Sequence, residues 1–342
     1  MTRLRARDEA PERPAGVAEG SVVTMFRVPP EMAGMRLDQF LKNHLKRTSR
    51  TRAQWIIQAS AYGSLGQRLR KNHRLMAEER VMLWRAPWDE DPVPQDLPVL
   101  FEDDFVLAID KPSGVPVHPT ARYHKNTVIK MLEELRPDQR ISLGHRLDRE
   151  TSGVLLLSKT ARADSALKKL FMDHDRVHKT YRGITFGVPP EAEFKVDLPL
   201  ELDSSSATKV KMRVAKPGRG LLARTTFRIV EVRRRDAARF ALVECDLHTG
   251  RQHQIRVHLA HIGFPLVGDK LYAFDETFFT RDRDNEGTAE DMEKLLLARH
   301  ALHAARISLP HPMFDETLTV EAPLPPDIAA FWDSLTREAA RV

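Results

Sequence analysis

Gly144-His-Arg-Leu-Asp-Arg-Glu-Thr-Ser-Gly153 is a polar stretch that leads directly into the apolar run Val154-Leu-Leu-Leu157. Four consecutive aliphatic residues beside a polar turn predict a buried strand, so the stretch is typical of a loop anchored by a core strand. Such loops commonly hold catalytic groups, because the strand fixes where their side chains lie. Asp148 is therefore the first candidate catalytic group, and an aspartate that only starts a turn is the structural alternative.

The composition indicates a protein of two domains without disulfides. The chain has 342 residues, of which 42% are hydrophobic and 30% are charged, enough to bury a sizeable core. The single cysteine, Cys245, excludes an intramolecular disulfide and a multi-cysteine zinc site. No apolar stretch approaches the length of a membrane span, and acids among the first twenty residues argue against a transit peptide. We expect a cytoplasmic protein whose residues 1–34 form a disordered tail and lead-in.

Most of the positive charge lies in one short segment. Between Arg36 and Arg85 there are twelve Lys or Arg and three acids, a net charge of +9, whereas the whole chain carries +6. Clustered cations release counterions from a phosphate backbone, so this segment is suited to binding a nucleic acid, and a solvated helix face is the structural alternative. The candidate RNA contacts are Arg36, Lys42, Lys46, Arg47, Arg50, Arg52, Arg68, Arg70 and Lys71.

Two short helices and a closing strand are expected within this segment. Leucine and phenylalanine recur at helical spacing from Leu37 to Leu45, and Ser49 or Thr51 can cap a second helix. Val81 to Trp84 has the apolar character of a strand. The residues of the second helix expected to face inward are Trp55, Ile56 and Ala59.

Residues 86–98 contain four prolines and four acids, a composition typical of an extended linker. Beyond it, residues 99–342 contain consecutive strand-length segments. They predict an α+β domain with a mixed, largely antiparallel sheet flanked by helices. Helices are expected over residues 249–261 and 328–340, and a strand over 208–214. The acidic residues 273–299 are expected to form a loop and a helix away from phosphate.

Three histidines, His253, His258 and His261, lie close together in the expected helix over residues 249–261. They are spaced five and three residues apart, and no His-Glu-x-x-His pattern accompanies them. This spacing does not match a helical zinc site. We expect structural or RNA-facing histidines, no metal and no cofactor.

Four motifs follow one another along the second domain. They are Asp110-Lys-Pro-Ser-Gly-Val-Pro-Val-His118, His145-Arg-Leu-Asp-Arg-Glu-Thr-Ser-Gly153, Lys179-Thr-Tyr181, and Thr249-Gly-Arg-Gln-His-Gln-Ile-Arg-Val-His258 continuing to Gly268-Asp269. In order and spacing they resemble the RluA-type pseudouridine synthases over residues 99 to 272. Residues 35–85 resemble the RNA-binding domain named after ribosomal small-subunit protein four, with Ala61-Tyr-Gly-Ser-Leu-Gly66 where such domains often have Val-Asn-Gly.

The resemblance implies a pseudouridine synthase-like fold and a cofactor-independent isomerisation of uridine to pseudouridine in structured RNA. Asp148 would be the catalytic residue, acting as general base or nucleophile on the ribose or the base. Arg256 would keep Asp148 anionic, Tyr181 would stack on the uracil and assist proton transfer, and Arg146 would fill the gap left by the flipped-out nucleotide. Further substrate contacts are expected at His145, Lys111, His118, Thr151 and Arg251.

Large-subunit ribosomal RNA is the expected substrate, with transfer RNA as the alternative. A non-catalytic RNA-binding protein of ribosome assembly would have no need of Asp148, Tyr181 and Arg256 together. A carboxylate-dependent hydrolase would usually use a second acid or a metal cluster. We expect a monomer that binds structured RNA and no membrane.

Overall fold

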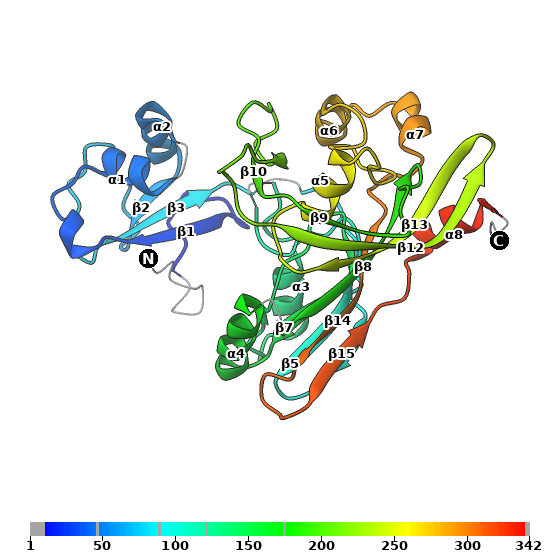
Figure 1. Ribbon diagram of the computed structural model, residues 1–342. Helices are drawn as coiled ribbons and strands as arrows, with labels where there is room; N and C mark the ends of the chain where they lie inside the picture. Colours follow the sequence, from blue (N-terminus) through cyan, green and yellow to red (C-terminus); the bar gives the residue numbers. More distant parts are fainter. Residues whose placement is uncertain (1–10, 46–47, 88–89, 121, 174–175, 339–342) are drawn as a thin grey trace. The chain divides into compact units, whose positions relative to one another are not determined.

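The computed structural model describes residues 11–45, 48–87, 90–120, 122–173 and 176–338 (Figure 1). The chain divides into two compact units, Met1–Asp89 and Glu90–Val342. Within the described residues, no helix is both long and apolar enough to cross a membrane.

The first unit is a three-stranded antiparallel sheet with two helices. The strand order is β1-β3-β2. The sequence predicted only a disordered tail and lead-in over residues 1–34. Part of this segment instead forms β1, which is held in the sheet by pairing along the whole length of β3. The elements of the first unit are β1 (Val22–Arg27), η1 (Pro30–Met32), α1 (Leu37–His44), α2 (Arg50–Ser60), β2 (Ala61–Gly63) and β3 (Arg80–Arg85).

The helix α2 turns a different face to the core than the sequence predicted. Ser49 caps the helix as expected, with its side chain accepting a hydrogen bond from the backbone of Arg52. The buried residues are Ala53, Ile57 and Ser60, whose spacing of four and three forms one helical stripe. Trp55 is 60% exposed, so the prediction that it faces inward is wrong. Ile56 is only partly buried and Ala59 is exposed, so they do not form the inner face either.

The second unit is built on one large sheet. In its described part, eleven strands pair in the order β16-β12-β13-β8-β14-β7-β5-β4, with β15 beside β14, β6 beside β7 and β9 beside β12. β10 (Leu200–Leu202) and β11 (Met212–Val214) form a separate two-stranded antiparallel sheet. The strands of the large sheet are β4 (Val99–Glu102), β5 (Val106–Lys111), β6 (Ser142–Leu143), β7 (Ser152–Ser158), β8 (His178–Phe186), β9 (Glu193–Asp197), β12 (Arg224–Arg235), β13 (Ala238–Leu247), β14 (Leu302–Pro310), β15 (Thr317–Glu321) and β16 (Thr336–Arg337).

The helices of this unit are α3 (Val128–Leu135), α4 (Ala161–Met172), α5 (Gln254–His261), α6 (Thr277–Arg283), α7 (Ala289–Leu295) and α8 (Pro326–Asp333). α4 contacts β7, and α5 contacts β11 and β12 (Figure 1). The strands pair antiparallel except β7 with β14, which run parallel. The predicted α+β domain with a mixed, largely antiparallel sheet is therefore confirmed.

The run Val154–Leu157 lies in β7 and is buried on both faces of the sheet. Leu155 and Leu157 belong to one hydrophobic cluster, while Val154 and Leu156 belong to another. Because successive side chains of a strand point to opposite faces, a strand covered on both sides is apolar at every position. The buried strand predicted after the polar stretch is confirmed.

Three predicted elements have different bounds in the structure. The helix over residues 249–261 begins only at Gln254, because the Gln254 side chain accepts hydrogen bonds from Thr249 and Arg251 and holds residues 249–253 in a turn. The strand over 208–214 is reduced to Met212–Val214. The C-terminal helix ends at Asp333, and Thr336–Arg337 instead pairs with β12.

Two acidic segments also differ from the structure predicted for them. Residues 273–299 contain two helices, α6 and α7, where one was expected. Glu90, in the segment predicted to be an extended linker, accepts hydrogen bonds from the backbone of His124, Lys125 and Asn126 at 2.7, 2.9 and 2.8 Å. These bonds attach the start of the second unit to the loop before α3.

Candidate active site

Asp148 lies in the loop between β6 and β7, and the loop of residues 111–115 holds the backbone that follows it. Lys111 Nζ donates to the carbonyl oxygens of Pro112, Val115 and Arg149 at 2.7, 2.9 and 3.0 Å. Lys111 is fully buried, and burial lowers its pKa to about 7. It was predicted to contact substrate, but its ammonium group is turned inward and fixes the loop.

Gly153 fixes the other end of the Asp148 loop. Its φ angle is +110°, and a Cβ atom there would lie 2.3 Å from the carbonyl oxygen of Ala304. Only glycine therefore allows β7 to approach β14 this closely. Together with the hydrogen bonds of Lys111, this contact holds Asp148 on a rigid support.

Arg256 joins two carboxylates. Its Nη1 donates to Asp148 Oδ2 at 3.2 Å, while its Nε and Nη2 donate to the two oxygens of Asp269 at 2.7 and 2.8 Å. Asp269 is fully buried and also accepts the backbone N–H groups of Leu271 and Tyr272. The bidentate pair with Asp269 sets the plane of the guanidinium group and directs one N–H toward Asp148.

The surroundings keep Asp148 negatively charged. Burial by itself would raise the pKa of Asp148, but the neighbouring His253 and Arg256 lower it below its ordinary value. Burial also lowers the pKa of His253 to about 4, so Arg256 is the cation that matters at neutral pH. The Asp148 side chain remains 29% exposed, whereas that of Arg256 is 7% exposed. The carboxylate is therefore ionised and still accessible.

Tyr181 lies near Asp148 on β8, where it pairs with Cys245 of β13 and Ala304 of β14. Its side chain is largely buried, in the same hydrophobic cluster as Leu147 of the loop that carries Asp148. Burial and the charge of Asp148 raise the pKa of Tyr181, so its phenol is neutral. The hydroxyl makes no hydrogen bond to any residue that the structure describes.

His253 and Tyr272 complete the surroundings of Asp148. His253 Nε2 is 3.8 Å from Asp148 Oδ2, and its Nδ1 is 2.8 Å from the Tyr272 hydroxyl. The guanidinium carbon of Arg256 lies 5.0 Å from the centre of the Tyr272 ring. Sequence reasoning assigned no catalytic-site role to His253, Asp269 or Tyr272. Asp269 carried a usable signal, because the last of the four sequence motifs continues to Gly268-Asp269.

Three further residues predicted to bind substrate have structural contacts. His145 Nε2 accepts the backbone N–H of Leu156 at 3.1 Å, and burial lowers the pKa of His145 to about 3. Thr151 is buried, with its hydroxyl 2.9 Å from His300 Nε2. Arg251 Nε donates to the carbonyl oxygen of Leu222 at 3.0 Å. The structure therefore places the ring of His145 and the hydroxyl of Thr151 against protein groups.

Arg146 and His118 are both exposed. Partial burial and the nearby charge of Arg146 lower the pKa of His118, so the two side chains lie close to each other. The side chain of Arg146 makes no hydrogen bond or ion pair with the described residues. Its guanidinium group is free to contact a substrate.

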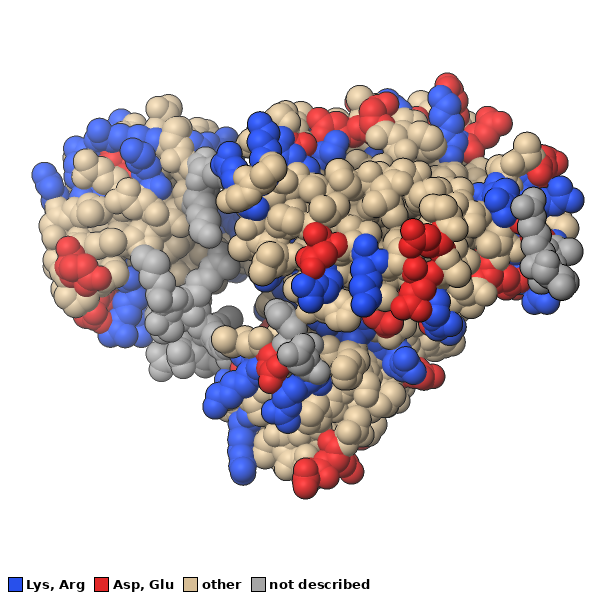
Figure 2. All heavy atoms as spheres, in the orientation of Figure 1, with Lys and Arg blue, Asp and Glu red and all other residues tan. Residues whose placement is uncertain are grey.

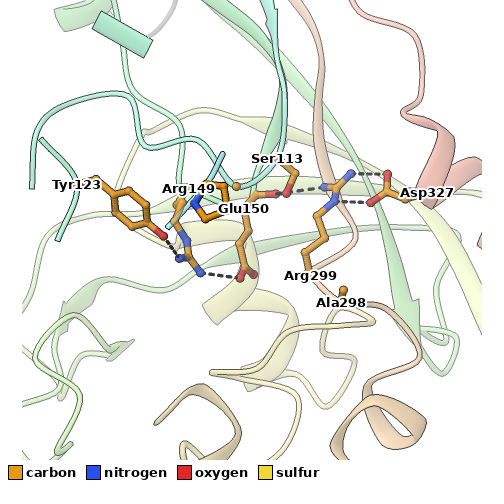
Figure 3. A pocket seen from close by; sticks show the side chains of 9 residues that line it. Ser113, Tyr123, Arg149, Glu150, Ala298, Arg299 and Asp327 are labelled. Atoms are coloured by element: carbon orange, nitrogen blue, oxygen red, sulfur yellow. Dashed lines mark hydrogen bonds and ion pairs between the residues drawn. The ribbon is translucent and has the colours of Figure 1, made fainter. Parts of the chain in front are cut away.

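A cavity of about 360 Å³ lies beside Arg149 and Glu150, and Asp148 is not among its lining residues. Figure 3 shows Arg149 directed toward Tyr123 and Glu150, and Arg299 directed toward Asp327. Burial would raise the pKa of Glu150, but His300 and Lys270 hold it well below the ordinary value. The charges around this cavity are thus already paired within the protein.

The predicted RNA-binding residues of the first unit fall into two groups. Figure 2 shows Lys and Arg side chains gathered on the face that carries α1 and α2. Arg36 and Arg50 both bond the buried Asp38, at 3.1 and 3.0 Å. Lys46 and Arg47 lie outside the described residues. The exposed residues of the predicted set are Lys42, Arg52, Arg68, Arg70 and Lys71, together with Arg50, which is exposed although it bonds Asp38.

The histidines that suggested a metal site have other neighbours. His258 Nδ1 lies 3.0 Å from the Thr225 hydroxyl, and its Nε2 lies 3.0 Å from the carbonyl oxygen of Leu198. Over the described part of the chain, no three His, Cys, Asp or Glu side chains are grouped so that they could hold a metal ion.

Comparisons with known proteins point to one family. The model of the family described as RNA pseudouridylate synthase matches residues 105–261. The chain is 34% identical to the ribosomal large subunit pseudouridine synthase D of Neisseria meningitidis, over 91% of this chain and 82% of that protein. It is 35% identical to the protein of the same name from Xanthomonas campestris, over 92% of this chain and 93% of that protein.

A solved structure shares the fold. Human RNA pseudouridylate synthase domain containing 1 superposes with a TM-score of 0.57 at 22% identity, covering 73% of this chain and 92% of that chain. Asp148 and Arg256 lie within the segment that the family model matches, and Asp269 lies in the loop that follows it. The chain belongs to the RNA pseudouridylate synthase family, in its RluA-type branch, and is an RNA pseudouridine synthase.

Proposed function

We propose that this enzyme converts specific uridines of large-subunit ribosomal RNA to pseudouridine, with Asp148 as the catalytic residue. The main support for this role of Asp148 is the chain of contacts from Asp148 through Arg256 to Asp269. It presents one accessible, ionised carboxylate on a rigid loop. The relatives named for the large ribosomal subunit support the choice of RNA, and transfer RNA is the second candidate.

The reaction requires three changes at the target nucleotide. The bond between C1′ of the ribose and N1 of the uracil breaks, the uracil turns, and a bond forms between C1′ and C5. The proton on C5 is then lost and N1 gains one, so the atoms balance without a cofactor. Asp148 acts first, either by attacking the nucleoside or by removing a proton from it.

Arg256 acts through Asp148 in this scheme. Its positive charge keeps Asp148 ionised, and the bidentate pair with Asp269 keeps the guanidinium group in place. A fixed cation needs no reorganisation when charge moves during the reaction. Arg256 and Asp269 are therefore positioning residues.

Tyr181 provides the surface on which the uracil stacks. Because burial and Asp148 raise its pKa, the phenol is neutral and is not itself a strong base. It can pass on the C5 proton only if it releases its own proton to another acceptor at the same time. Its hydroxyl is available for this proton transfer, since it makes no hydrogen bond to any described residue.

Arg146 fills the space that the flipped-out nucleotide leaves in the RNA. Its exposed and unpaired guanidinium group supports this role, because a side chain that inserts into RNA has to project from the protein without a partner there to hold it. His118, close to Arg146, contacts the same part of the RNA. Arg251, partly exposed, contacts the RNA near the start of α5.

Residues 35–85 form an RNA-binding domain like that of ribosomal small-subunit protein four. The exposed cations around α1 and α2 support this assignment, because they can neutralise several phosphates (Figure 2). Residues 86–98 connect it to the catalytic domain of residues 99–342. The enzyme acts as a monomer in the cytoplasm, where ribosomal RNA is found.

The test is to map pseudouridines across ribosomal and transfer RNA from cells with and without this protein. We expect positions in large-subunit ribosomal RNA that disappear without the protein, return with the wild type, and do not return with Asp148→Asn. Loss confined to transfer RNA would reject the ribosomal assignment. Full restoration by Asp148→Asn would reject the role of Asp148.

A further inference from the structure

Lys179 belongs to the Lys179-Thr-Tyr181 motif, and the scheme above gives it no role. It lies in β8, two residues before Tyr181. Its side chain lines the same small cavity as Tyr181, next to an irregularity of β14 between Ala304 and Arg306. It pairs across the sheet with Ile307 of β14.

The surroundings of Lys179 place its ammonium group beside the active site. A Cβ atom on Gly250 would lie 3.6 Å from Lys179 Nζ, so the amine lies against the turn that precedes α5. Lys179, Tyr181 and His145 line the same small cavity. The charge of Lys179 also contributes to the lowered pKa of His145, next to Arg146 in the catalytic loop.

Lys179 has no charged or hydrogen-bonding partner among the described residues. Other cations around the site differ: Arg256 bonds Asp269 and Asp148, and Lys270 bonds Glu150 at 2.8 Å. Lys179 is only partly exposed, and burial lowers its pKa without an acid close enough to offset this effect. An ammonium group held partly out of water with no anion is unfavourable unless a ligand supplies the anion.

We propose that Lys179 binds a backbone phosphate of the RNA strand beside the flipped-out uridine. The proposal rests on the proposed function, because the substrate strand supplies the anion. Phosphate is the anion that RNA brings to the site, and the absence of a side chain at Gly250 keeps the approach to the amine open. Binding at this point anchors the strand within reach of Tyr181 and Asp148.

The experiment compares Lys179→Gln with Lys179→Arg and with the control Lys294→Gln. Lys294 is a lysine of α7 that already pairs with Glu290. Binding of full-length protein to an unmodified large-subunit ribosomal RNA transcript is measured by fluorescence anisotropy at several KCl concentrations. Tritium release from the same transcript, labelled at C5 of uridine, measures turnover at saturating enzyme.

Lys179→Gln is expected to bind the transcript about 3- to 10-fold more weakly, with the slope of log affinity against log salt reduced by about one. Lys179→Arg should retain the wild-type slope, and Lys294→Gln should change neither quantity. The melting temperature of Lys179→Gln should equal or exceed that of the wild type, because a partly buried, unpaired charge is removed.

Three results would overturn the proposal. They are an unchanged salt slope in Lys179→Gln, a lowered melting temperature that accounts for the lost activity, or a lower rate at saturating enzyme with unchanged affinity. The last result would assign Lys179 to proton transfer. A wild type that releases no tritium from this transcript contradicts only the ribosomal substrate, and transfer RNA transcripts then replace it in the same comparison.

Discussion

Asp148, Arg256 and Asp269 form a chain of ion pairs in a largely buried setting, whereas Arg70 and Lys71 of the first unit are exposed and have no ion-pair partner among the described residues. In the chain Asp148–Arg256–Asp269 each charge is held by a specific partner, so its direction and protonation are set before substrate arrives. Arg70 and Lys71 remain in water, and under the proposed RNA-binding role such charges act by their number. Chemistry and RNA affinity should therefore be separable by mutation.

The largest separation is expected for Asp148→Asn. Replacing the Asp148 carboxylate by an amide should lower tritium release from C5-labelled uridine by at least about 10³-fold. RNA affinity should stay within about twofold, since Asp148 adds no attraction for phosphate. Single-turnover kinetics and anisotropy on the same transcript check both values. Normal turnover in this variant would show that Asp148 is not the catalytic residue. The paired charges around it would then have no special part in the chemistry.

Asp269→Asn tests whether the chain of ion pairs acts through orientation. The amide cannot form the bidentate ion pair with Arg256, so the single-turnover rate should fall about 10- to 100-fold. The free energy of unfolding at pH 7 should fall by about 3–5 kcal/mol. Asp327→Asn is the matched control, because Asp327 also pairs bidentately with an arginine, Arg299, but does not connect to Asp148. Its rate should stay near that of the wild type.

The stability loss in Asp269→Asn should depend on pH. Arg256 holds the pKa of Asp269 below its ordinary value despite burial, which by itself would raise it. A lowered pKa in the folded state adds stability above the unfolded-state pKa of about 3.9, and this stability is lost as pH falls through the folded-state value. Urea unfolding should therefore show a difference between wild type and variant that is full at pH 7 and shrinks below about pH 4. A constant difference would mean that the charge of Asp269 is not what stabilises the fold.

The smallest effect on chemistry is expected from changes on the first unit. The triple variant Arg52→Gln, Arg70→Gln, Lys71→Gln should bind RNA about tenfold more weakly, with a salt slope reduced by up to about three. Its rate at saturating enzyme should be unchanged. Arg50→Gln is the control: Arg50 already bonds Asp38, so its loss should affect stability more than affinity. A reduced rate with unchanged affinity in the triple variant would erase the distinction between the two regions.

Parts of the site could be predicted because they lie close together in the chain. The loop before β7 was visible as a polar stretch ahead of four aliphatic residues, and the antiparallel hairpin of β12 and β13 as consecutive strand-length segments. The predicted contact between Asp148 and Arg256 is present at 3.2 Å, although the two residues are 108 positions apart. It was expected from the family resemblance, since spacing in the sequence carries no information about such a distance.

Other parts could not be predicted because they depend on burial by distant segments. Lys111 was expected from the resemblance to contact substrate, but its three donors are taken by carbonyl groups. Trp55 looked like a core residue because it is large and apolar, yet the helical stripe that meets the sheet excludes it. His253 was not recognised because its position near Asp148 depends on a left-handed backbone conformation, with φ of 56°.

The sequence alone determined the sheet-rich catalytic unit, the basic character of residues 35–85 and the candidate carboxylate, because hydrophobic periodicity and charge density are local properties. The tertiary structure decided which charges are paired. It joined Asp269 to Asp148 through Arg256, turned Lys111 inward, and left Lys179 without an anion. These outcomes depend on distances between segments far apart in the chain and on the water that folding removes from each group, and both are properties of the folded protein.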